Sequence, residues 1–543
     1  MTDTSPPSGP VLAADGRPLK ASLRRALRRE KMRAMLLIAP LLLFILITFV
    51  IPIGQMLFRS VENQIVSDVL PRTTKALDGW SFNDGAAPDE DVFFALTQDM
   101  IVATERKEHT RLGSRLNYEK SGMSSLFRKS GRNVDDIGEG YADQFTAIDP
   151  VLTDAATYAA LFGADAWTNA VAADDGLAVT LPFKLNDAAA TALPRTADAY
   201  REFAIFNQEV DEKDPRSTKL WNSVSLALYN DLLADPAATV SGPAAGAIAA
   251  AAMAAASFET EVLSASFAKI DKDWLDPEVW TVIKRYSPDF TNGYFLNAVD
   301  MEKTVDGPAW RDEDQQIYLT LFWRTLLMSM TITISGILLG YPVAWLLANL
   351  PNRQANLLMI LVLLPFWTSL LVRTSAWKVL LQQQGVINDI VVWLGLVADD
   401  NRLQLINNAT GTIIAMTHIL LPFMILPLYS VMKTIPVTYV RAAKSLGATN
   451  WTAFWRVYFP QSIPGIGAGS ILVFIMSIGY YITPEIVGGT KGVFISNRIA
   501  YNISSSLNWG LAAALGAILL AVVMLLYWAY DRIVGIDNVK LGG

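Results

Sequence analysis

The sequence has 543 residues, of which 52% are hydrophobic and only 17% are charged, and its formal net charge at pH 7 is −7. It contains no cysteine, which excludes a disulfide framework, a thiolate metal site and a cysteine nucleophile. The two histidines, His109 and His418, lie far apart in the sequence, so a histidine-rich metal centre is excluded as well. The composition indicates a membrane protein.

Residues 1–33 form a basic tail in front of the first long apolar stretch. Three acids, Asp3, Asp15 and Glu30, stand against eight basic residues: Arg17, Lys20, Arg24, Arg25, Arg28, Arg29, Lys31 and Arg33. Basic segments beside a span stay inside the cell, so the N-terminus is predicted to be cytoplasmic. Residues 34–58 could be a signal peptide, but they are too long and lack a small-residue cleavage site. We predict a retained transmembrane helix, over Ala34–Leu57.

Residues 59–316 are predicted to form an extracytoplasmic (periplasmic) insert domain. Their net charge is −19, against +12 for the rest of the chain. An acidic insert on a basic membrane body argues against nucleic-acid binding. The mixture of alanine, charge and scattered aromatic residues predicts a mainly helical fold with a strand near 177–183, and we identify no internal repeat.

The alanine-rich stretch 244–256 is the one segment of the insert that could be confused with a span. It is short, it follows Gly242 and Pro243, and alanine is a strong helix former but a poor membrane residue. A crossing there would also move every later loop to the opposite side. We predict a helix packed against others.

The fold class is an all-α polytopic membrane protein with six transmembrane helices, since a crossing needs roughly 20 apolar residues. The part after the insert, residues 317–543, holds the last five predicted helices: 320–348, 357–380, 411–432, 463–482 and 510–530. Six crossings return the C-terminus to the cytoplasm, where Arg532 and Lys540 follow the last span.

The cytoplasmic loop 433–462 has the pattern of a folded unit. Pro436 can begin a helix because its missing N–H is not needed there. The helix over 437–446 places three residues on one face, namely Tyr439, Ala443 and Leu446. Gly447 is suited to the left-handed position just past the helix end.

A second short helix is predicted to follow this glycine corner. Asn450 can cap it, Phe454 and Val457 face one way, and Pro460 ends it. Ala442 and Ala443, both small, would let another protein's backbone come close. An ordinary amphipathic turn at the membrane surface is the simpler alternative, but the loop's side and position favour a docking element.

The loop resembles the cytoplasmic coupling loop of the membrane subunits of ABC importers. The resemblance is carried by Ala442–Ala443, by Gly447 four residues on, and by Phe459–Pro460. Arg441 stands where the family motif commonly has glutamate. Four further stretches resemble the first permease subunit of spermidine/putrescine-type importers: 340–348, 363–377, 421–428 and 480–489. The resemblance covers roughly 320–530 and the first span, but not the insert.

The resemblance implies a transport subunit of the bacterial inner membrane that is not itself an enzyme. Its expected partners are two ABC ATPase subunits, a second permease in a heterodimer, a periplasmic substrate-binding protein and membrane lipid. The chain is expected to bind no cofactor or metal, with ATP and Mg on the partner ATPase. Gly488–Gly492 lacks the spacing and the Lys-Ser/Thr ending of a phosphate-binding loop.

Polar and aromatic residues near the outer membrane side are candidates for the translocation path: Trp367, Thr368, Ser369, Trp377, Tyr480, Tyr481 and Glu485. Glu485 could attract a cationic amine and the aromatic rings could add cation–π attraction. Interfacial aromatics and a solvated glutamate are the alternative. Arg373 is expected to face the interface or to pair with an acid.

Two features are expected to be structural. His418 lies within a span and could relay protons, but a neutral, hydrogen-bonded packing role is favoured. Gly465, Gly467 and Gly469 resemble a dinucleotide fingerprint, yet no strand precedes them. Close helix packing is the favoured reading.

Several functions stay open. Within the importer class, the substrate is predicted to be a polyamine, with thiamine, ferric iron, phosphonate or opine-like solutes as alternatives. A secondary transporter should show inverted repeats and buried carboxylates within its spans. A membrane-anchored periplasmic sensor would need a cytoplasmic signalling domain, and the inside loops are short.

Overall fold

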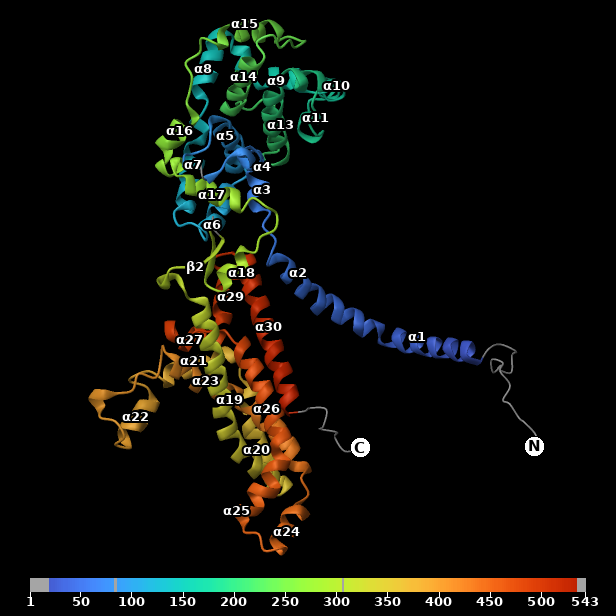
Figure 1. Cartoon of the computed structure of the whole chain (residues 1–543), viewed down its shortest axis with the longest axis vertical. Coiled ribbons are helices and arrows are strands. Elements are labelled where there is room, and N and C mark those ends of the chain that lie inside the picture. The colour runs from blue at the N-terminus through green and yellow to red at the C-terminus, as the bar shows by residue number, and fades with distance from the viewer. Residues whose placement is uncertain (1–18, 83–84, 305–306, 535–543) are drawn as a thin grey trace, which may run out of the picture. The chain divides into compact units, whose positions relative to one another are not determined.

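The computed structural model describes residues 19–82, 85–304 and 307–534, so Lys540 and most of the basic tail lie outside the described residues. The chain divides into two compact units, residues 62–292 and the remainder. We call the first the insert unit and the second the membrane unit (Figure 1). The insert unit is shorter than the predicted domain 59–316, because residues 293–316 belong to the membrane unit.

The membrane unit begins with a long apolar helix. It runs through α1 (Leu19–Ile45), a π-helical turn η1 (Leu46–Val50) and α2 (Ile51–Arg59). The part long and apolar enough to cross a membrane is Glu30–Arg59. Its side chains are almost all exposed, as expected for a helix that faces lipid or a partner subunit.

Four more helices of the described chain are long and apolar enough to span a membrane. They lie within α19 (Tyr318–Asn349), α23 (Ala409–Thr434), α26 (Phe459–Gly479) and α30 (Trp509–Val534). Glycines let α26 approach α23 closely: a Cβ on Gly465 would lie 3.0 Å from Val431 Cβ, and one on Gly469 would lie 2.7 Å from Met424 Sδ. The predicted packing role of the glycine run is therefore confirmed.

The predicted continuous span over 357–380 is wrong. The structure has α20 (Asn352–Leu363), a 3₁₀ turn η8 (Leu364–Trp367) and α21 (Leu370–Leu380), with a 95° bend between the two helical parts. Pro365 cannot donate a backbone hydrogen bond, and Ser369 Oγ accepts one from Val372 N at 3.2 Å, which starts a new helix. The described chain thus has five candidate spans, or six if the bent pair is one span.

Smaller elements complete the membrane unit. They are α18 (Gly293–Ala298), the antiparallel strands β1 (Met301–Thr304) and β2 (Gly307–Trp310), η7 (Glu313–Gln315), α22 (Val386–Trp393), η9 (Asp399–Asn401), α24 (Val437–Ser445), α25 (Asn450–Ala453), η10 (Phe454–Tyr458), α27 (Ile482–Val487), α28 (Gly489–Gly492) and α29 (Ile495–Ser504). Asp300 fixes the start of α19, because its carboxylate accepts bonds from the backbone N–H groups of residues 317, 318 and 319 at 2.8–3.0 Å.

Among the described residues of the insert unit, the regular elements are helices joined by loops. Its α-helices are α3 (Ile65–Val69), α4 (Pro71–Ala76), α5 (Glu90–Glu105), α6 (His109–Leu116), α7 (Met123–Asn133), α8 (Glu139–Ile148), α9 (Ala155–Phe162), α10 (Asp165–Ala173), α11 (Leu177–Thr180), α12 (Asp187–Ala192), α13 (Pro194–Glu209), α14 (Asn222–Ala234), α15 (Ala245–Ala255), α16 (Leu263–Ile270) and α17 (Pro277–Arg285). Short 3₁₀ helices lie between them: η2 (Leu77–Gly79), η4 (Val134–Asp136), η5 (Pro150–Thr153) and η6 (Lys272–Leu275). The alanine-rich helix α15 buries one face in the core, as predicted.

The insert unit contains two copies of one helical pattern, so the prediction of no repeat is wrong. Residues 70–73 read Leu-Pro-Arg-Thr, and the same four residues recur at 193–196. In the first copy, Thr73 donates from N and Oγ1 to the buried carboxylate of Asp99, at 2.7 and 2.8 Å. In the second copy, Thr196 donates in the same way to Asp231, at 2.8 Å for both bonds.

The later part of each copy also matches. An aspartate starts a 3₁₀ helix and a second aspartate caps the next helix: Asp149 and Asp154 for η5 and α9, Asp271 and Asp276 for η6 and α17. An aromatic side chain then donates back to the 3₁₀ helix. Tyr158 bonds the carbonyl of Leu152 and Trp280 that of Trp274, both at 2.7 Å.

The two copies close on each other at their ends. The first copy runs from Glu62 to Gly163 and the second from Leu185 to Phe290. Gly163 pairs with Leu185 and Glu62 pairs with Phe290, so the end of each copy meets the start of the other. Moreover, α8 packs on α14 of the other copy, and α16 packs on α5. The longest run of identical residues in the two copies is the four residues Leu-Pro-Arg-Thr, and α4 is much shorter than α13. Both differences hide the repeat in the sequence.

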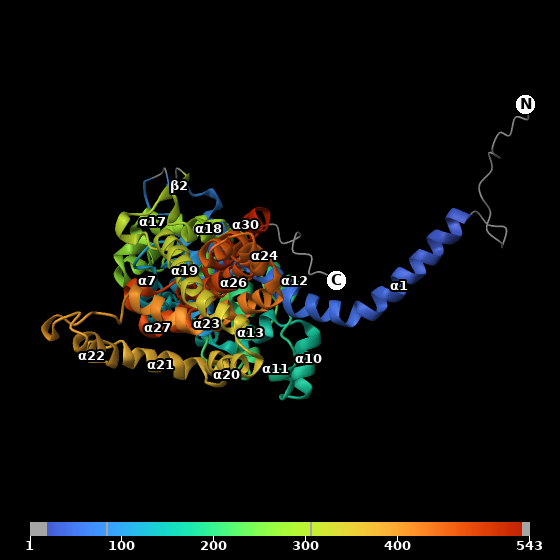
Figure 2. The same cartoon turned by 90° about the horizontal axis from the view of Figure 1, so that it is seen from below.

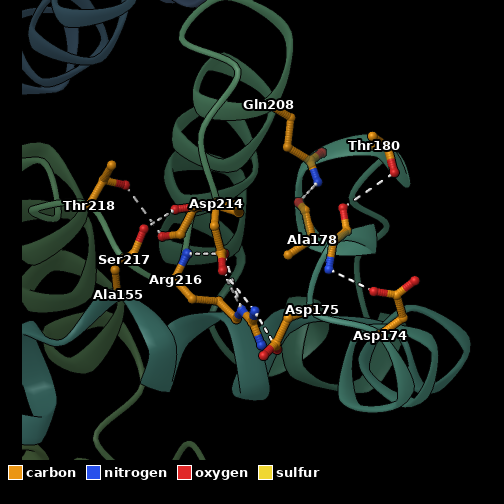
Figure 3. A network of polar contacts seen from close by, with 12 residues as sticks. Ala155, Asp174, Asp175, Ala178, Thr180, Gln208, Asp214, Arg216, Ser217 and Thr218 are labelled. Atoms are coloured by element: carbon orange, nitrogen blue, oxygen red, sulfur yellow. Dashed lines mark hydrogen bonds and ion pairs between the residues drawn. The ribbon is translucent and has the colours of Figure 1, made fainter.

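The connection between the copies holds the segment predicted to be a strand near 177–183. It is instead the helical turn α11, preceded by a turn in which Asp174 Oδ1 accepts from Gly176 N at 2.9 Å. The side-chain amide of Gln208 in α13 donates to the carbonyl of Ala178 at 2.6 Å (Figure 3). It also donates to the carbonyl of Leu181 at 2.9 Å. Arg216 bridges Asp214 and Asp175, so the connection is fixed to the second copy.

Candidate docking loop and translocation path

The predicted coupling loop begins as expected. Helix α24 starts directly after Pro436, and Gly447 has φ +89°, which confirms the left-handed corner. The amide of Gly447 bonds the carbonyl of Lys444 at 3.0 Å and that of Ala448 bonds Ala443 at 3.1 Å, so the last carbonyls of α24 are satisfied.

The second helix differs from the prediction at both ends. Thr449, and not Asn450, is its cap, since Thr449 Oγ1 accepts from Thr452 N at 3.2 Å. Pro460 does not end it, because α25, η10 and α26 form one continuous helix over Asn450–Gly479. Pro460 lies inside this helix, directly after the π-helical turn η10, and an irregular turn of this kind accommodates a proline within a helix.

The loop has an exposed apolar tip and a packed base. Leu446 at the corner is 90% exposed, Trp451 is 72% exposed, and Tyr439 is half exposed. At the base, Phe454 packs edge to face against Tyr341 of α19. Of the two small residues, Ala442 is exposed and Ala443 half-buried, and Arg441 has no ion pair among the described residues.

Trp367, Thr368 and Ser369 lie at the break between η8 and α21. Trp367 is 75% exposed, and Ser369 serves as the cap of α21. Irregular backbone at membrane depth is stable only where it is buried in protein or lines a water-filled space. The break, which the sequence did not predict, therefore places the three candidate path residues in or beside irregular backbone.

Trp377 of α21 meets His418 of α23. The indole Nε1 donates to His418 Nδ1 at 3.1 Å, and the rings pack edge to face. A nitrogen that accepts a hydrogen bond carries no proton, so this contact requires a neutral ring. His418 therefore has the hydrogen-bond partner that was expected, although its side chain is exposed. Nearby, Arg373 forms no ion pair within the described chain, and its Nε is buried without a partner.

Tyr480, Tyr481 and Glu485 are brought together where α26 ends and α27 begins. Asn497 of α29 donates to the carbonyl of Tyr481 at 2.9 Å and to Glu485 Oε2 at 2.6 Å. Ser496 donates to the carbonyl of Tyr480 at 2.6 Å. Glu485 thus has a neutral hydrogen-bond partner and remains exposed.

The insert unit has a half-open cavity of about 380 Å³ that the sequence did not reveal. It lies between α4 and α5 of the first copy and α13 of the second, and Arg72 is among the residues that line it. Arg72 pairs with Asp99 at 3.1 Å, Asp198 at 2.7 Å and Glu202 at 3.6 Å. The pairs with Asp198 and Glu202 join the two copies.

The chain is similar to known membrane components of transport systems. Residues 336–534 match the family described as "Binding-protein-dependent transport system inner membrane component". The spermidine/putrescine transport system permease protein PotB of Salmonella typhimurium is 34% identical over 220 residues, which are 40% of this chain and 76% of PotB. PotB of Escherichia coli K12 is 33% identical over 220 residues, 79% of its length, and the permease YdcU of the same organism is 32% identical over 224 residues, 70% of its length.

Two solved structures are similar at lower identity. A chain of a bacterial alginate ABC transporter is 16% identical, with a TM-score of 0.35, over 42% of this chain and 81% of that one. A chain of the MetNI methionine ABC transporter is 18% identical, with a TM-score of 0.31, over 40% of this chain and 94% of that one.

The apolar helices and the sequence match together define an inner-membrane permease of the ABC importer class. The chain belongs to the family of inner-membrane components of binding-protein-dependent transport systems, and its permease core is of the spermidine/putrescine type. In this family a separate ATPase hydrolyses ATP. The family match begins at residue 336, after the insert unit.

Proposed function

We propose that this chain is one of two permease subunits of an ATP-driven importer that takes up polyamines. The coupling loop is the observation that carries the proposal. Its tip exposes Tyr439, Leu446 and Trp451 on a cytoplasmic corner, and isolated apolar side chains of this size are suited to a groove on a partner ATPase. The continuous helix from Asn450 to Gly479 would transmit a push on this corner to the membrane core.

The complete importer would contain this chain, a second permease, two ATPase subunits and a periplasmic substrate-binding protein. ATP-driven closure of the ATPases would move the coupling loops together and switch access to the path between the two sides. In this chain the path would pass Trp367 at the broken span and Glu485 in α27, just beyond the end of α26. The PotB relatives support polyamines as the cargo.

Docking is tested by changing the corner. Gly447→Val forces a β-branched residue into a left-handed conformation, at a cost of roughly 1–2 kcal/mol. Leu446→Glu places a charge at the apolar tip. Both variants should lower ATPase co-purification and uptake at least fivefold, whereas Met253→Glu, an equally exposed change in the insert unit, should have no effect. Normal ATPase retention and normal uptake in both corner variants would contradict the docking role.

The cargo is tested by uptake of radiolabelled spermidine in cells that depend on this importer. Vanadate should abolish uptake. Glu485→Gln removes the carboxylate charge but keeps an acceptor for Asn497, so it should reduce uptake about tenfold if the charge attracts the amine. Asp400→Asn, at another exposed acid, is the control. Spermidine uptake unaffected by Glu485→Gln would remove Glu485 from the path.

A further inference from the structure

Residues 381–408, between α21 and α23, form an arm that projects from the bundle of the membrane unit (Figures 1 and 2). The arm contains α22 and the 3₁₀ turn η9. Among the described residues, α22 packs closely against no other helix or strand. The arm must therefore owe its shape to its own hydrogen bonds.

Two side chains lock the arm internally. Asn388 is buried; its Nδ2 donates to the carbonyls of Gln382 and Leu403, at 3.1 and 2.9 Å, and its Oδ1 accepts from Leu403 N at 3.0 Å. Arg402 bridges Asp389 at 2.7 Å and Asp399 at 2.8 Å. A hairpin fixed in this way presents a defined surface.

That surface is apolar. Trp393 is 83% exposed, and the other large exposed apolar side chains of the arm are Val386, Ile390, Leu394, Leu396 and Leu403. Exposed apolar side chains also occur on the preceding helix α21, at Leu371, Val372 and Val379. So many exposed apolar side chains on one short arm mark an interaction site.

We propose that the arm docks on the second permease subunit of the importer, with Trp393 as its central anchor; the inference rests on the proposed function. Its acidic edge argues against a lipid surface, because the arm carries Asp389, Asp399 and Asp400 against one arginine, and interfacial helices that bind anionic lipid are rich in Lys and Arg. A soluble binding protein could not cover the exposed apolar residues of α21, because α21 belongs to the bent pair of helices that together are long and apolar enough to enter a membrane. A membrane-spanning partner can cover both.

The first test is photo-crosslinking from residue 393 in the complete importer, purified through a tag on this chain. A benzophenone amino acid at Trp393 should yield a product of this chain with a six-span permease that co-purifies with the ATPase. The same group at Asp400, on the acidic edge, should yield at least fivefold less. A product only with the binding protein or with phospholipid would overturn the inference, as would no product while the second permease is retained.

The second test measures assembly. Trp393→Asp should lower the retained second permease at least fivefold, while Trp393→Phe and Asp400→Asn should leave it unchanged. Equal retention in all variants would overturn the inference and leave the proposed function standing. A wild-type preparation that retains neither an ATPase nor a second permease would overturn both.

Discussion

Asp99 is buried at the seam between the two copies of the insert unit, and burial raises its pKa to about 6 even though Thr73 and Arg72 bond its carboxylate. An acid whose pKa is higher in the folded than in the unfolded chain binds a proton more tightly when folded. This group therefore stabilises the fold at pH 4, and its contribution is lost as the pH rises from about 4 through 6.

We predict that the wild-type insert unit loses up to about 3 kcal/mol of stability from this group between pH 4 and pH 7.5. Asp99→Asn is uncharged at every pH and should remove this part of the pH dependence. Hydrogen exchange of α5 in the full-length protein, corrected for intrinsic rates, measures the difference between the two proteins. Parallel pH profiles for wild type and variant would contradict the assignment of the titration to Asp99.

Individual residues of the coupling loop were predictable where local backbone geometry decides. Gly447 is a left-handed corner because only glycine adopts that conformation without cost. The cap was misassigned because Thr449 and Asn450 are adjacent, and both residue types cap helices well. The choice depends on one hydrogen bond, which the sequence does not reveal.

Among the helices of the membrane unit, α23 and α26 pack closely at Gly469, and this contact gives a sharp prediction. Gly469→Leu would push against Met424, whose carbonyl oxygen lies 3.2 Å and whose Sδ lies 2.7 Å from a Cβ at that position. We expect a loss of several kcal/mol or a separation of the helices. Thermal unfolding of the purified protein should show a clear decrease in Tm.

The control for this variant is Gly246→Ala, in α15 of the insert unit. A Cβ there meets no atom within 4 Å, and alanine favours a helix, so the Tm should stay the same or rise slightly. An unchanged Tm for Gly469→Leu would show that the two membrane helices are not held together through this glycine.

The long helices were predictable and the interruptions were not. Apolar runs of about 20 residues locate α19, α23, α26 and α30 within a few positions. The break at Thr368–Ser369 was missed because apolar residues flank it on both sides and hydropathy averages over it. Likewise, the repeat in the insert unit is conserved in hydrogen bonds and capping aspartates more than in residue identity.

For the whole molecule, the absence of cysteine makes topology directly testable. We predict that a cysteine introduced at Lys444 reacts with a membrane-impermeant maleimide only after the cells are opened, and one introduced at Met253 reacts in intact cells. The prediction follows from the basic tail and from three crossings between the two positions, with the bent pair α20–α21 taken as one span. Labelling of position 444 from outside would place the coupling loop in the wrong compartment and refute ATPase docking.

The entry and exit strands of the insert unit meet, since Glu62 pairs with Phe290 and the amide of Asn63 bonds the carbonyl of Asp289 at 2.8 Å. A module whose ends are neighbours needs only a narrow stalk and can be gained or lost without stretching the host. Removal of residues 64–288, with the two ends joined by a few glycines, should thus leave a folded membrane unit with a short loop in place of the insert unit. Any activity that this shortened protein lacks can then be assigned to the insert unit.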